Sequence, residues 1–159
     1  MTRLLLRTHE AWLRAVSMLE SLQPLAQLAA RLYVAQVFFL SGLTKVRDWD
    51  TTLMLFNDDY RVPVLPPEFA AVLGTGGELV LPVLLALGLF GRFAALGLTV
   101  LNIVAALSLA DIAEPALQQH VFWGSLLIGL LLWGPGRWSV DGLLGARLWQ
   151  RLRLRRQTA

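Results

Sequence analysis

Cysteine is absent from the 159-residue sequence, and histidine occurs only twice, at His9 and His120. Without cysteine the chain forms no disulfide, no thiolate metal site and no dithiol redox relay. The two histidines lie far apart in the sequence, so intrinsic haem and a zinc or copper site built by this chain are not expected. The sequence therefore predicts no intrinsic cofactor, and any flavin, haem or metal has to come from another component.

Charged residues are also scarce, at 16% of the chain, whereas 56% of the residues are hydrophobic. A soluble domain usually carries about a quarter charged residues, so this chain has too few polar side chains to cover a water-facing surface. The net charge of +3 comes from arginines concentrated in the two tails, which fits an anionic membrane surface better than nucleic acid. We expect one membrane domain with the lipid bilayer as its partner, and no nucleic-acid binding.

Long apolar stretches predict an all-α, polytopic membrane protein built on a bundle of four transmembrane helices. The apolar block from Phe69 to Ala110 is too long for one span, because at about 1.5 Å per residue it would far exceed a hydrocarbon core of about 30 Å. A turn at Gly88, Gly91 and Arg92 divides this block into two spans. The membrane domain is expected over residues 28–138, with spans at about 28–46, 69–90, 93–110 and 116–133.

Both ends of the chain are basic and amphipathic. In residues 1–27, apolar side chains recur at helical spacing opposite polar ones, which predicts an amphipathic cytoplasmic helix that Pro24 ends or kinks. This segment lacks the unbroken apolar stretch of a cleaved signal peptide, so we expect none. In the tail, residues 139–159, five arginines alternate with leucine and tryptophan. This pattern predicts an amphipathic strip on anionic lipid.

The positions of lysine and arginine predict the orientation in the membrane. Eleven of the fourteen lie toward the two ends of the chain or at the turn at Arg92, whereas Lys45, Arg47 and Arg61 belong to the first loop. Under the positive-inside rule we expect both termini in the cytoplasm. The loop at 47–68, with five acidic residues against two arginines, is then an extracytoplasmic segment resting on the interface.

Glu78 is the most informative polar residue, because it falls near the middle of the second predicted span. An ionised carboxylate at that depth needs a partner or a function, and a structural ion pair has roughly even odds. Lys45, near the outer end of the first span, is the favoured partner, and Arg31, approaching from the cytoplasmic side, is the alternative.

Two further polar residues are candidates for the same region. Asn102 lies near the middle of the third span, where its amide is expected to bond Glu78 or a backbone group, and a purely interhelical bond is favoured by about two to one. His120, at the outer start of the fourth span, is suited to proton transfer or metal binding near neutral pH, although a lone interfacial histidine more often does neither.

Several motifs follow one another in a fixed order over roughly residues 28–145. They are Phe39, Leu40, Ser41, Gly42, Leu43, Thr44 and Lys45 before Asp48 and Trp49; Pro63 and Pro66; Gly77, Glu78 and Leu79 with Pro82, Leu84, Leu85, Gly88 and Arg92; and Gly134, Pro135, Gly136, Arg137, Trp138, Ser139, Val140 and Asp141. In this order they resemble the bacterial DoxX family.

The resemblance implies a four-helix inner-membrane protein, related to a subunit of a quinone-linked thiosulfate or terminal oxidase system and in some members tied to redox-stress assemblies. It does not imply one activity for all members. Residue by residue, the positions that match the family are Arg31, Gly42, Lys45, Glu78 and Arg92.

Three functions are compatible with these observations. The first is an accessory subunit of a membrane oxidoreductase system, more a non-catalytic subunit than an enzyme on its own, with Lys45, Glu78 and Asn102 around a quinone head group and a soluble or membrane redox partner. The second is a small transporter or proton pathway centred on Glu78. The third is a structural stress-response protein whose acidic loop recruits a partner. A homo-oligomer is compatible with each.

Overall fold

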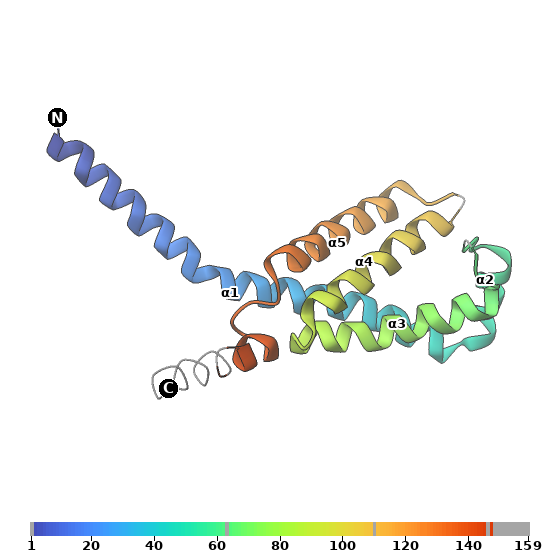
Figure 1. The fold of residues 1–159 in the computed structure, drawn as a ribbon. Helices are drawn as coiled ribbons and strands as arrows, with labels where there is room; N and C mark the ends of the chain where they lie inside the picture. The colour runs from blue at the N-terminus through green and yellow to red at the C-terminus, as the bar shows by residue number, and fades with distance from the viewer. Residues whose placement is uncertain (1, 63, 110, 146, 148–159) are drawn as a thin grey trace.

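The computed structural model describes residues 2–62, 64–109, 111–145 and 147, and within these residues the chain is helical with no strand. A single isolated bridge pairs Tyr60 with Leu109. Figure 1 shows a bundle with the start of α1 and the segment after α5 toward one end, here called the terminal end, and the short α2 at the other, the loop end. The helices are α1 (Thr2–Arg47), α2 (Trp49–Asp58), α3 (Pro67–Leu87), α4 (Gly91–Ser108) and α5 (Glu114–Trp133).

Four of these helices, α1, α3, α4 and α5, are long and apolar enough to cross a membrane. This confirms the predicted all-α membrane fold with four spans. The chain turns between α3 and α4 where the sequence predicted, although α3 ends at Leu87 rather than at 90. Gly88 takes a left-handed conformation with φ of 65° and ends α3 as its C-cap, which a residue without a side chain adopts at little cost.

The first helix is longer than the predicted span. It runs without a break from Thr2 to Arg47 and contains Pro24 in its interior, so Pro24 does not end the helix. A proline removes one main-chain hydrogen bond and usually bends a helix rather than abolishing it when the flanking turns are strong helix formers. In Figure 1 the N-terminal part of α1 projects away from the bundle at an angle to the remainder of the same helix.

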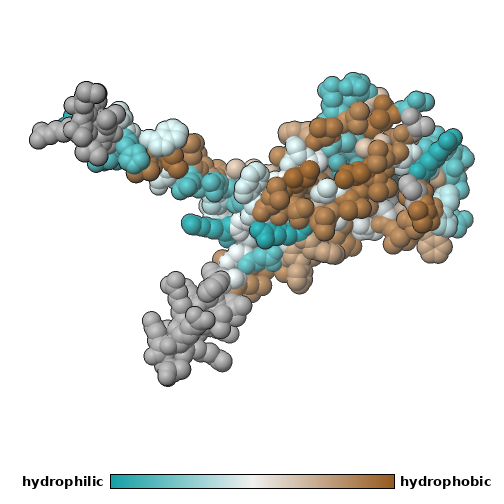
Figure 2. Space-filling model, turned by 45° about the horizontal axis from the view of Figure 1, so that its top comes forward, coloured by the Kyte–Doolittle hydropathy of each residue, from teal (hydrophilic) through white to brown (hydrophobic). Residues whose placement is uncertain are grey.

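The core is a cluster of small and branched side chains between the four long helices. Gly77 and Gly97 allow α3 and α4 to approach closely, because a Cβ at either position would lie 2.7 Å from a leucine of the facing helix. Apolar residues outside the core cover the surface of the bundle, and hydrophilic surface gathers toward the loop end (Figure 2). The buried cluster comprises Val34, Phe38, Leu85, Ala94, Ala95, Leu98, Leu127 and Leu130.

The segment after α5 closes the terminal end of the bundle. The carboxylate of Asp141 accepts hydrogen bonds from the main-chain N–H groups of Phe90 (3.0 Å) and Gly91 (2.8 Å), and therefore satisfies the start of α4. The N–H of Asp141 donates in turn to the carbonyl of Gly88 at 3.0 Å. Residues 140–145 form a further helical turn. Of the predicted basic tail, residues 146 and 148–159 lie outside the described residues.

Candidate functional site

The loop end is covered by α2, which returns the chain across the bundle. Asp48 caps this helix, accepting hydrogen bonds from the main chain (3.1 Å) and hydroxyl (2.7 Å) of Thr51, and these bonds lower the pKa of the Asp48 carboxyl. The hydroxyl of Thr52 donates to the carbonyl of Lys45 at 2.9 Å, which fixes α2 to the end of α1. Phe56, on the same face of α2, packs into the start of α3. The amphipathic pattern of this segment thus builds a cover over the site below.

Under this cover, Lys45 of α1 and Glu78 of α3 form an ion pair. The Nζ atom of Lys45 lies 2.6 Å from Oε2 of Glu78, and the two side chains are only 20% and 12% exposed. The predicted pairing of these two residues is confirmed. Ser41, one turn before Lys45, accepts a hydrogen bond from Nζ at 2.9 Å and donates to Oε1 of Glu78 at 3.4 Å. A carboxylate paired and hydrogen-bonded in this way is stable in a poorly hydrated setting.

Gly42 brings α1 and α3 close enough for this contact. A Cβ at Gly42 would lie 3.1 Å from Cβ of Glu78 and 3.0 Å from the side chain of Leu79. Any larger residue would therefore move the two helices apart at the height of the ion pair. This packing explains the spacing of the three residues. Ser41 and Lys45 make the polar contacts with Glu78, and Gly42 between them allows the two helices to approach closely.

The ion pair lines a cavity of about 350 Å³ between α2, α3 and α4, here called the loop-end pocket. Apart from the ion pair, the hydroxyl-bearing Tyr60 and Ser108 are its polar side chains, and the remaining wall is apolar. Leu73 and Val100 line the pocket and are also exposed on the outside of the bundle, so the pocket reaches the lipid-facing surface. The apolar part of the wall comprises Phe56, Val62, Leu65, Ala70, Leu73, Gly74, Val100, Leu101, Val104 and Ala105.

Tyr60 is a residue of this pocket that the sequence interpretation did not select. Its ring lies against Phe56, one turn earlier, with centroids 4.9 Å apart. Burial, with smaller contributions from the charges of Glu78 and Asp59, raises the pKa of Tyr60, which keeps the phenol neutral and able to donate a hydrogen bond. The only sequence signal was a tyrosine one helical turn after a phenylalanine in the acidic loop, and that signal does not identify a pocket.

Asn102 does not line the loop-end pocket, so the structure does not bring the three predicted residues Lys45, Glu78 and Asn102 together. Its Nδ2 donates to the carbonyl of His120 at 2.9 Å, and its Oδ1 lies 2.8 Å from Nδ1 of the same histidine. The expectation of an interhelical bond to a backbone group is thereby confirmed. The reason is helical geometry: Leu101 faces the pocket, and the next residue points about 100° further round the helix, toward α5.

His120 and Arg31 also have definite places. His120 is held by Asn102, and among the described residues no group of three or more metal-ligating side chains occurs. Arg31 is buried at 1% exposure at the terminal end, where Nη2 donates to the carbonyl of Trp138 at 2.5 Å. It is therefore not the partner of Glu78, and the alternative pairing is wrong. Its Nε and Nη1 are buried without a hydrogen-bond partner among the described residues.

Comparison with known proteins gives two matches and one absence. Residues 26–111 match the DoxX family model, a range that includes the ion pair, α2 and the whole loop-end pocket. A protein of Haemophilus influenzae, described as uncharacterized, is 31% identical over 126 residues, which cover 74% of this chain and 82% of that protein. No solved structure matches.

Proposed function

The chain belongs to the DoxX family, and from this premise we propose that it is an accessory subunit of a membrane oxidoreductase system that holds a quinone head group in the loop-end pocket. The observation that carries the proposal is the Lys45–Glu78 ion pair in the wall of an otherwise apolar cavity. In this proposal the protein lies in the bacterial inner membrane with its terminal end in the cytoplasm, as the arginine distribution predicts.

The hydrogen-bonding capacity of the pocket suits a quinone. An ammonium group has three N–H donors, and Lys45 uses one on Ser41 and one on Glu78, so one donor remains for a carbonyl oxygen. The phenol of Tyr60 makes no hydrogen bond to the described residues and supplies a second donor. A cavity of about 350 Å³ lies within the range of small-molecule sites, which combine apolar walls with a few placed polar groups.

The opening of the pocket also suits a ligand that arrives through the membrane. Leu65, Leu73 and Val100 line the pocket while 42%, 59% and 52% exposed, respectively. In a bilayer the exposed surfaces of Leu73 on α3 and Val100 on α4 face lipid, so an isoprenoid tail can remain in the hydrocarbon while the head group enters between the helices. A water-soluble substrate would gain nothing from such an apolar rim.

The redox chemistry in this proposal belongs to a partner. The sequence has no cysteine and two histidines, so electrons reach or leave the quinone through a flavin, haem or metal on another subunit. The alternative, a proton pathway centred on Glu78, has less support. Leu85, about two turns further along α3, and Leu98 of α4 are almost fully buried in the core, and apolar packing there interrupts a polar route toward the terminal end.

The test is binding of a short-tailed ubiquinone to the purified protein, and binding is measured as quenching of the tryptophan fluorescence. Trp49 packs beside the Phe56 cluster next to the pocket, so we expect saturable quenching. The double variant Lys45→Met, Glu78→Gln removes both charges together, and should weaken binding about tenfold or more, which corresponds to loss of a charge-assisted hydrogen bond.

The matched control is Arg47→Met, which removes an exposed cation two residues from Lys45 and outside the pocket. It should bind the quinone as the unaltered protein does. Equal affinity in the double variant and the control, with both folded, would refute the proposed site. A titration without saturation would refute the proposed ligand.

A further inference from the structure

Two cavities meet at the terminal end of the bundle, on the opposite side of the membrane from the loop-end pocket. The first is an apolar groove of about 480 Å³ between α1 and α5. The second is a larger cavity of about 990 Å³ between α1 and residues 136–143. Gln23 and Gln27 line both, so these two amides mark the border at which an apolar space passes into a polar one.

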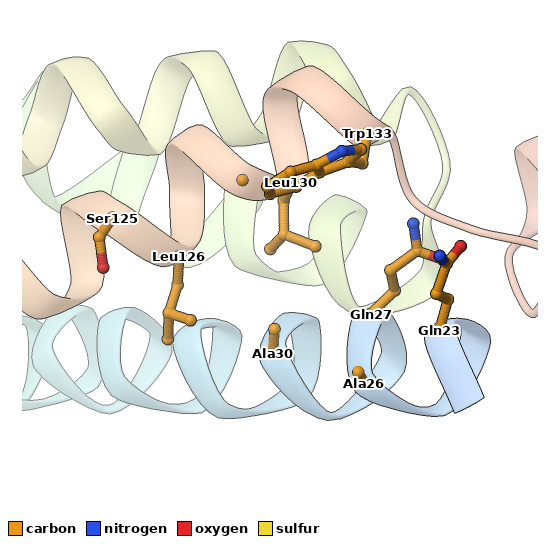
Figure 3. Close-up of a pocket in the computed structure, with 9 residues that line it drawn as sticks. Gln23, Ala26, Gln27, Ala30, Ser125, Leu126, Leu130 and Trp133 are labelled. Carbon is orange, nitrogen blue, oxygen red and sulfur yellow. The ribbon is translucent and has the colours of Figure 1, made fainter. Parts of the chain in front are cut away.

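The groove has the mainly apolar walls of a site for a hydrocarbon chain. Figure 3 shows Leu126 and Leu130 pointing from α5 toward α1, where Ala26 and Ala30 present only small side chains. Both helices are membrane-spanning candidates, so a chain lying between them is parallel to the acyl chains of the bilayer. The groove ends at Trp133, the last residue of α5, where the helix meets the level of the lipid head groups.

The adjoining cavity carries one charge of each sign. Glu20 of α1 and Arg137 of the closing segment both line it. Both are exposed, and no ion pair joins them, although both lie in the part of the chain that the structure describes. Neither amide at the border, Gln23 or Gln27, has a hydrogen-bond partner among the described residues. The cavity thus offers a cation, an anion and two neutral amides to one ligand.

We propose that this pair of cavities binds one phosphatidylethanolamine molecule. One acyl chain occupies the groove, the phosphate accepts hydrogen bonds from Arg137, and the primary ammonium donates to Glu20. The charge pattern favours this class: a phosphate paired with Arg137 is common to all phospholipids, but only the primary ammonium combines a positive charge with N–H donors and so forms a charge-assisted hydrogen bond to the carboxylate. Phosphatidylcholine has no N–H in its head group, and phosphatidylglycerol has no cation for Glu20.

The test is native mass spectrometry of the full chain in detergent, with phosphatidylethanolamine, phosphatidylcholine and phosphatidylglycerol of identical acyl chains at equal concentration. We expect one retained phosphatidylethanolamine per chain, favoured about fivefold over each competitor, as one head-group charge contact at a membrane surface provides. Glu20→Gln should remove the preference over phosphatidylglycerol. Arg137→Gln should lower retention of all three, whereas Arg47→Gln at the loop end should change nothing.

The groove is tested separately by filling it. Ala30→Phe places a ring in the groove, and should lower lipid retention about tenfold. Ala29→Phe adds the same ring to an exposed neighbouring position that lines no described cavity, and should leave retention unchanged. The proposal is overturned if the three lipids are retained equally, or if Ala30→Phe retains lipid as Ala29→Phe does. If Ala30→Phe fails to fold, the head-group variants alone decide, because they alter only exposed side chains.

Discussion

The first helix buries a cation near each end of its membrane span, and the two are stabilised in different ways. Lys45 at the loop end is paired with the formal charge of Glu78 at 2.6 Å. Arg31 at the terminal end has no ion pair among the described residues. It contacts the carbonyl of Trp138 and lies beside Gly88, the C-cap of α3, where exposed carbonyls and the helix dipole carry partial negative charge. The cation is therefore paired directly with a carboxylate at the loop end, whereas at the terminal end it is held by backbone carbonyls, and the charge of Asp141 acts on it without a direct ion pair.

The strongest test of this contrast is Glu78→Ala, which leaves Lys45 as a buried cation without its carboxylate. We expect a loss of about 3 to 5 kcal/mol in the free energy of unfolding in detergent. Adding Lys45→Met should recover part of the loss, because the unpaired charge is then gone. Unchanged stability in Glu78→Ala would show that water, not Glu78, stabilises Lys45.

At the terminal end, Gly88→Ala should lower the stability more than Arg31→Met does. A Cβ at Gly88, whose φ is 65°, would collide with Nη1 of Arg31 and with Cβ of Ser139. Left-handed strain and overpacking together should cost about 2 to 4 kcal/mol, measured by the same unfolding assay. Gly145→Ala, where a Cβ meets no neighbour, is the control and should be close to neutral.

A smaller effect is expected for Arg31→Met, and this sharpens the contrast between the two cations. Its removal leaves one carbonyl, that of Trp138, without a donor, but no unpaired carboxylate, and it eliminates two buried nitrogens that lack partners. We expect a cost of about 1 to 2 kcal/mol. A loss as large as that in Glu78→Ala would mean that Arg31 has an anionic partner after all.

The smallest effect concerns pH and is confined to the loop end. The pKa of Tyr60 is raised in the folded protein, so between the unfolded value of about 10 and the folded value the native state holds more protons than the unfolded state. Stability should therefore decrease as the pH rises above about 10. Tyr60→Phe should reduce this decrease, as seen by thermal unfolding at pH 9 and pH 11. An identical pH dependence in both proteins would place the phenol in water.

The features that follow from the order of apolar and charged residues along the chain were predictable from the sequence. Apolar runs gave the four spans, and the cost of a buried carboxylate required a partner for Glu78, with Lys45 at a suitable depth. The direction of a side chain around its helix was not predictable in the same way. Whether Asn102 faces Glu78 or His120 depends on the rotation of α4 against α5, which the packing of many residues decides together.

Two other features depend on tertiary context that no local pattern contains. The position of Arg31 depends on the segment after α5 folding back onto α1, more than 100 residues later in the chain. Tyr60 enters the pocket because the chain after α2 pairs with the end of α4 through Leu109. The continuity of α1 through Pro24 has a local cause instead: residues on both sides of the proline form helix readily, and a rule about proline alone does not weigh them.

The unbroken course of α1 makes this helix far longer than one membrane span. At about 1.5 Å per residue, a helix of 46 residues is roughly 70 Å long, more than twice the thickness of a hydrocarbon core of about 30 Å. This helix carries Lys45 near its C-terminal end, and its N-terminal part projects beyond the bundle (Figure 1). One continuous helix therefore connects the surface beyond the terminal end of the bundle with the ion pair at the loop end.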